Sequence, residues 1–178
     1  MKASMRLAAS LIAVAILCGV FFTSMGAAPV ADAAEDASVS FTDVPDGAWY
    51  AEAANWCKAQ GILLGDTFSP DTAMTRATVA EALYRVEGTP SVSGGTSFSD
   101  IEAGSIYASA AAWTSANGVM SGYGGGVFGA NDPVTREQMA AILWRYAGSP
   151  AAGSSQDFAD KDSIASYAQT AVNANMKL

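Results

Sequence analysis

The feature that most constrains the fold of this chain is an internal repeat. Phe41-Thr42-Asp43 returns 57 residues later as Phe98-Ser99-Asp100, and Phe158-Ala159-Asp160 follows after a further 60 residues. The first two copies stay in register, apart from three residues inserted into a glycine-rich loop of the second. Self-similarity at this spacing predicts one supersecondary unit built repeatedly, whose copies bury their apolar faces against each other.

The first two copies agree along most of their length. A tryptophan, a glycine and a Thr-Arg pair recur at aligned positions, as Trp56 and Trp113, Gly61 and Gly118, and Thr75-Arg76 and Thr135-Arg136. The third copy keeps Tyr167-Ala168 but has no loop and no Thr-Arg pair before Leu178. We therefore expect two full units and the first part of a third.

Each full unit has the pattern of two short helices joined by a loop. The first helix of the first unit is indicated by apolar residues at helical spacing, Trp49, Ala53, Trp56 and Cys57. Gly61 is placed to end this helix, and Thr75 is placed to cap a second one with apolar positions across 79–86. In the second unit Thr135 and Gln138 form a capping box. The predicted fold class is mainly α, with tandem helix–loop–helix units that pack together because two short helices cannot bury a core alone.

The first residues have the pattern of a secretory signal peptide. Lys2 and Arg6 precede an almost wholly apolar run over 7–22, which is shorter than the roughly 20 residues of a membrane span. Small residues follow, and we expect cleavage after Ala33, with Ala28 as the alternative. The expected mature protein is secreted and has no stable membrane insertion.

These signals divide the chain into seven segments. The predicted boundaries are a signal peptide at 1–33, a flexible lead-in at 34–40, a first repeat at 41–90, a linker at 91–97, a second repeat at 98–150, a linker at 151–157 and a truncated third repeat at 158–178.

Composition excludes several kinds of chemistry. The chain has no His, so it can hold neither a Ser-His-Asp triad nor a His-ligated zinc ion. Its formal net charge of −8 argues against nucleic acid as a partner. Once the signal peptide and Cys18 are removed, Cys57 is the only cysteine, and a buried helical side chain is the favoured interpretation. We expect no metal and no cofactor.

Arg76 and Arg136 are the leading candidates for ligand binding. Each follows the predicted N-cap of a second helix, where a cation is unfavourable for the helix macrodipole. Arginine can hold a carboxylate through two parallel hydrogen bonds, and free helix amides also favour anions. A corner that binds an acidic group is therefore one interpretation. The other is an ion pair with a neighbouring aspartate, such as Asp71 or Asp132.

Five further residues are weaker candidates for contact with a ligand. Trp49 could stack on a sugar or pack in the core, and Gly65 and Gly122 could admit a ligand to the main chain or simply form turns. Asp43 and Asp100 could contact a ligand or hold the backbone of their own units.

The repeated motifs resemble the S-layer homology domain. In the first unit the resemblance rests on Phe41-Thr42-Asp43-Val44, Gly61 to Gly65, Phe68-Ser69-Pro70 and Thr75-Arg76-Ala77. The second unit repeats this order with Phe98, Asp100, Gly118 to Gly122, Phe128 and Thr135-Arg136-Glu137. The resemblance covers nearly all of the chain from Phe41 onward.

This resemblance implies a fold and a function. Three repeats of the family form a three-pronged helical spindle, which this chain would form incompletely. The grooves between repeats hold secondary cell-wall polysaccharide, often with acidic pyruvyl groups, and the arginine of the family's Thr-Arg-Ala-Glu motif corresponds to Arg76 and Arg136. Thr78 replaces the motif's Glu in the first unit, and Glu137-Gln138 replaces Ala-Glu in the second.

The resulting functional hypothesis is a non-catalytic module that anchors a secreted protein to the cell wall or surface layer. Its expected partner is the wall polysaccharide, with another chain that completes the third unit as a further candidate. Two alternatives stay open, a structural envelope subunit that self-assembles and, with least support from the sequence, a wall-active hydrolase.

Overall fold

The structure, a computed structural model, describes residues 39–93, 98–151 and 158–175. The predicted signal peptide, most of the lead-in and part of each predicted linker lie outside the described residues.

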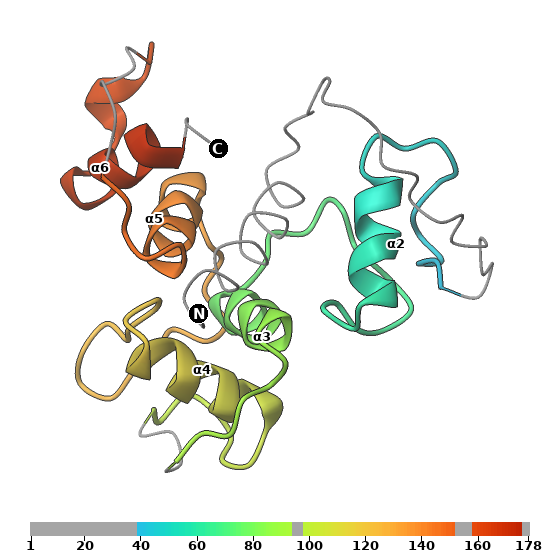
Figure 1. Cartoon of the computed structure of the whole chain (residues 1–178), viewed down its shortest axis with the longest axis horizontal. Helices are drawn as coiled ribbons and strands as arrows, with labels where there is room; N and C mark the ends of the chain where they lie inside the picture. Colours follow the sequence, from blue (N-terminus) through green and yellow to red (C-terminus); the bar gives the residue numbers. More distant parts are fainter. Residues whose placement is uncertain (1–38, 94–97, 152–157, 176–178) are drawn as a thin grey trace, which may run out of the picture.

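The described residues form a mainly α structure, as the sequence predicts (Figure 1). Its elements are α2 (Ala51–Ala59), α3 (Arg76–Val86), α4 (Ile106–Ala116), α5 (Arg136–Tyr146), the 3₁₀ turn η1 (Lys161–Ser163) and α6 (Ser166–Asn175). Each full unit is a helix–loop–helix, and the third contributes η1 and α6. In this part of the chain no β-strand occurs, only two isolated bridges.

The residues predicted to begin and end the helices do so in the structure. Thr75 Oγ1 accepts the amide of Thr78 at the start of α3, and Thr135 and Gln138 form the complete capping box of α5. Gly61, with φ of +66°, follows the last turn of α2 in the left-handed conformation that favours glycine. Local sequence therefore sets where these helices begin and end.

Trp49 differs from the expectation. It lies before α2 rather than on its apolar face, and 85% of its surface is exposed. The spacing that placed Trp49 in the helical stripe was misleading because α2 begins only at Ala51. Cys57 is buried on α2, and burial raises the pKa of its thiol, in agreement with a packed and unreactive side chain.

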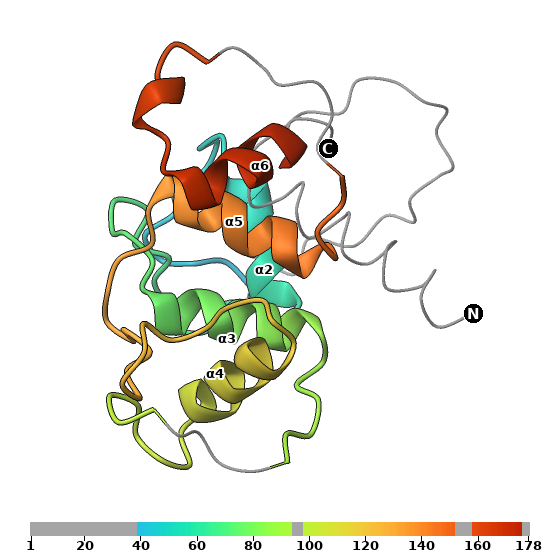
Figure 2. The same ribbon diagram turned by 90° about the vertical axis from the view of Figure 1, so that its left-hand side faces the viewer.

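The helices pair between units rather than within them. Helix α3 of the first unit packs along α4 of the second, and α5 of the second unit packs along α6 of the third. Figure 2 shows these two pairs, and Figure 1 shows α2 standing apart from both. Each unit therefore completes the core of its neighbour, as expected for units that cannot bury a core alone.

The main core lies around the α3–α4 pair. Ala80 and Ala110 are fully buried and small enough to let two helices approach. Phe128, Leu83 and Met120 fill the space beside them, with Phe128 and Met120 coming from the second unit and its loop. None of the helices in the described ranges has both the length and the apolar character needed to cross a membrane.

Candidate ligand-binding site

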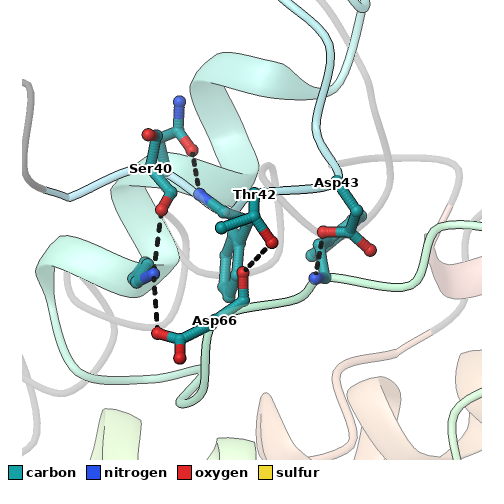
Figure 3. A network of polar contacts seen from close by, with 8 residues as sticks. Ser40, Thr42, Asp43 and Asp66 are labelled. Atoms are coloured by element: carbon teal, nitrogen blue, oxygen red, sulfur yellow. Dashed lines mark hydrogen bonds and ion pairs between the residues drawn. The ribbon is translucent and has the colours of Figure 1, made fainter.

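The opening motif of each full unit forms hydrogen bonds to the backbone of that unit's loop. In the first unit the Asp43 carboxylate accepts the amides of Phe68 at 2.6 Å and Ser69 at 2.7 Å, and the Thr42 hydroxyl donates to the Asp66 carbonyl at 2.9 Å (Figure 3). In the second unit Asp100 accepts three successive loop amides, those of Phe128, Gly129 and Ala130, each at 2.8 Å. Both aspartates thus hold the backbone of their own units.

These hydrogen bonds favour the charged form of each carboxylate. The amide of Phe68 lowers the pKa of Asp43, and that of Phe128 lowers the pKa of Asp100. Because the pKa of Asp100 is lower in the folded protein than its ordinary value of 3.8, the charged carboxylate stabilises the fold at any pH above 3.8. This stabilisation is lost as the pH falls through the pKa of the folded protein.

We therefore expect acid to remove the stabilisation due to Asp100. The difference in unfolding free energy between wild type and Asp100→Asn should be constant above about pH 5 and shrink as the pH falls below about 4. Urea unfolding at each pH measures it. Asp46→Asn is the control, since no described residue donates a hydrogen bond to Asp46. A difference that stays constant down to pH 3 would contradict the prediction.

Arg76 is enclosed between the first two units. Only 6% of its surface is exposed, and its guanidinium donates to the carbonyls of Phe128 at 2.9 Å and Ser121 at 2.7 Å. It lies over the rings of Tyr123 and Phe128, at 4.5 and 5.0 Å from their centroids. Arg76 therefore fastens α3 to the loop of the next unit.

The amides at the start of α3 are also occupied. The Arg76 amide donates to the Asp132 carbonyl, the Ala77 amide to the Ala130 carbonyl, and the Thr78 amide to Thr75. The expected ion pair of Arg76 with Asp71 or Asp132 is wrong, because backbone carbonyls of the loop take the guanidinium donors instead. The structure leaves no open corner for an acidic ligand at this helix.

Arg136 occupies the same position on α5 but has a different environment. Its side chain is exposed, and within the described ranges it makes no hydrogen bond or ion pair. Thr135 accepts the Gln138 amide, whereas the amides of Arg136 and Glu137 have no partner in the same ranges. An exposed guanidinium thus stands beside two free amides at the positive end of a helix macrodipole.

Glu137, which the sequence did not single out, connects the second and third units. Its carboxylate accepts the Ala165 amide at 2.9 Å and the Tyr167 hydroxyl at 3.1 Å. Burial raises the pKa of Tyr167, and the hydrogen bond to Glu137 adds to this rise. Ala165 stands at the position of Ser105, whose side chain caps α4 by accepting the Ala108 amide. Glu137 does not replace that cap, because it accepts the amide of Ala165 itself, whereas the Ala168 amide donates to the Ala165 carbonyl.

Several aromatic side chains are exposed. Trp49 meets the edge of Tyr50 with ring centroids 5.5 Å apart, and Tyr50 stacks on Phe68 at 5.6 Å. Tyr123, which covers Arg76, is 57% exposed, and Tyr167 is 48% exposed. These rings could contact sugar faces; Trp49 belongs to the first unit, whereas Arg136 lies on α5 of the second.

The two candidate glycines have different surroundings. A side chain at Gly122 would collide with the Val127 carbonyl and the Phe98 ring, so this glycine is required by packing. Gly65 adopts φ of +97° with open space beside its Cα. Across the described ranges no three His, Cys, Asp or Glu side chains gather as metal ligands.

Comparison with known proteins identifies the repeated unit. The family model of the S-layer homology domain matches residues 40–80 and 97–140. Each match runs from the opening motif through the first helix and the loop into the second helix. A search of curated proteins gave no match.

Proposed function

Because the chain is an S-layer homology domain protein, and this domain is a cell-surface anchoring module, we propose that it attaches to the cell wall by binding an acidic secondary polysaccharide. In this proposal the protein is secreted, its signal peptide is removed, and it acts without catalysis. The polymer carries carboxylate groups, such as pyruvyl groups, and is held in grooves between repeats.

The observation that carries the proposal is the environment of Arg136. Its guanidinium can form two parallel hydrogen bonds to a carboxylate, and the free amides of Arg136 and Glu137 can donate to the same group. Arg76, at the matching position, is already bonded to the neighbouring loop. We therefore assign the acid-binding role to Arg136 alone.

The overall charge shapes how such binding would work. With a formal net charge of −8, the protein does not attract an acidic polymer over long range. Binding must come from local contact at Arg136, supported by exposed aromatic rings such as Trp49 and Tyr167. Several contacts along one polymer would raise the overall affinity.

The Arg136→Gln variant tests this assignment. The change removes the charge of an exposed side chain, so we expect the fold to persist and binding to isolated sacculi to weaken about ten-fold or more. Pelleting of the protein with sacculi, at a series of protein concentrations, measures the affinity.

Arg145→Gln is the matched control, because Arg145 carries the same charge in the last turn of the same helix. It should pellet as the wild type does. Equal binding by wild type and Arg136→Gln, or equal weakening in both variants, would show that Arg136 does not bind the polymer.

A further inference from the structure

Glu137 places a fixed negative charge one residue from the exposed Arg136. It is the second residue of α5, so it belongs to the same helical turn as Arg136 and as the free amides of both residues. Two donors of the third unit hold its carboxylate, the Ala165 amide at 2.9 Å and the Tyr167 hydroxyl at 3.1 Å. An anion that approaches the two free amides therefore meets a carboxylate that is already held in place.

The contacts of Glu137 keep its charge at this end of α5 without cancelling it. Helix α6 packs along α5, and Figure 2 shows the two side by side. Ala165 and Tyr167 lie at the start of α6, and both donate to Glu137 from uncharged groups. Within the described ranges no Lys or Arg forms an ion pair with Glu137. The full negative charge of the carboxylate thus acts on whatever binds beside it.

This carboxylate is an addition to the repeated pattern. The aligned residue of the first unit is Ala77, whose amide donates to the Ala130 carbonyl. The start of α5 does not depend on Glu137 for its cap, because Thr135 and Gln138 form the complete capping box. Glu137 therefore adds a negative charge in the unit whose Thr-Arg arginine is exposed, and not in the unit whose arginine is enclosed.

The charges at this helix end nearly cancel. Arg136 contributes one positive charge, Glu137 contributes one negative charge, and the macrodipole adds about half a positive charge. Because the remaining attraction for an anion is weak, hydrogen-bond geometry decides more than charge does. A planar carboxylate matches the two parallel donors of a guanidinium. A phosphate monoester carries almost two negative charges at neutral pH and is repelled by Glu137 about twice as strongly as a carboxylate is.

We propose that Glu137 determines the ligand specificity of the Arg136 site, by favouring groups with a single negative charge, such as a pyruvyl carboxylate, over phosphate monoesters. The inference rests on the proposed function, since it concerns the same site. Glu137 lowers the affinity of that site for every anion, and lowers it most for the anion with the highest charge. The site thereby distinguishes a polymer that carries carboxylates from one that carries phosphate monoesters.

Two synthetic methyl glycosides of one hexose test the proposal, one with a pyruvyl ketal and one with a phosphate monoester. Isothermal titration calorimetry at about pH 8, where the monoester is a dianion, measures both affinities. The wild type should bind the ketal more tightly. Glu137→Gln keeps an acceptor for Ala165 and Tyr167 but removes the charge. It should tighten ketal binding about three-fold and phosphate binding about ten-fold, because a dianion interacts twice as strongly with the charge that is removed.

Three further variants separate charge from structure. Glu137→Ala, which carries the residue of the aligned Ala77, should shift the ratio of the two affinities as Glu137→Gln does. Glu102→Gln changes the net charge equally at an exposed residue of the second unit and should leave both affinities unchanged. Tyr167→Phe removes one donor to Glu137 but keeps the charge, so it should change both affinities by the same factor.

Several results would overturn the proposal. One is a wild type that binds the phosphate as tightly as the ketal. Another is a Glu137→Gln variant that tightens both equally or tightens neither, and a third is a shift of the ratio by Tyr167→Phe that equals the shift by Glu137→Gln. Failure of the proposed function gives a different result, ketal binding that Arg136→Gln does not weaken. Binding of neither glycoside would overturn both.

Discussion

Replacing Arg76 with Ala should lower the free energy of unfolding by about 3 kcal/mol, because two carbonyls lose their donor and two rings lose a stacked cation. The carbonyls of Ser121 and Phe128 are bonded by this guanidinium, and Tyr123 lies over it. Since the second-unit loop also covers α3, the loss should fall on the whole α3–α4 core. Urea unfolding followed by circular dichroism measures the change.

Two variants show whether the cause is the guanidinium. Arg76→Lys keeps the charge but has one nitrogen in place of the separate Nε and Nη2 donors that reach Phe128 and Ser121, so it should recover less than half of the lost stability. Arg136→Ala removes the aligned arginine of α5, which is exposed, and should change stability by no more than about 0.5 kcal/mol. Equal destabilisation by Arg76→Ala and Arg136→Ala would contradict the conclusion that the hydrogen bonds of Arg76 to the second unit's loop stabilise the fold.

Replacing Phe128 with Ala should be the most damaging single truncation, at about 3–5 kcal/mol. Phe128 is fully buried, packs on Phe98 with ring centroids 5.1 Å apart, and lies under the Arg76 guanidinium. Its removal leaves a cavity at the junction of the loop, α3 and the second-unit opening. The midpoint of urea unfolding should fall without a change in its slope.

Phe68→Ala is the internal control for this prediction. Phe68 is the aligned residue of the first unit and packs on Phe41 and Tyr50. It is only half-buried, and among the described residues no arginine lies over its ring. We expect about half the loss seen for Phe128→Ala. A larger loss for Phe68→Ala would show that the first unit, rather than the α3–α4 junction, carries most of the stability.

The sequence predicts the local structure well. Helix caps at Thr75 and Thr135, the glycine end of α2 at Gly61, and the helix–loop–helix order of each unit are all present. Each of these depends on hydrogen bonds or backbone angles within a few residues, and such interactions leave a readable signal in one short segment.

The pairing of helices could not be predicted in the same way. An apolar stripe shows that a helix is covered but not by which partner, and here α3 packs on α4 of the next unit. The placement of Trp49 in the helical stripe was wrong for a different, local reason, because helical spacing continued two residues before the helix begins. Long-range packing decided the helix pairing.

Recurrence in the sequence proved a poor guide to the candidate site. Arg76 and Arg136 follow the same cap in aligned helices, yet one is sealed by a loop and the other is exposed. The difference comes from the neighbouring unit, since the loop with Tyr123 and Phe128 covers only α3. Two identical motifs can therefore serve stability in one unit and be available for binding in the other.

The most direct test of wall anchoring compares pelleting of the wild-type protein with sacculi before and after chemical removal of their secondary polysaccharide. If the proposal is right, the protein pellets with intact sacculi and stays in the supernatant with stripped ones. Equal pelleting with both would contradict it, because binding would then be to peptidoglycan or to other protein molecules.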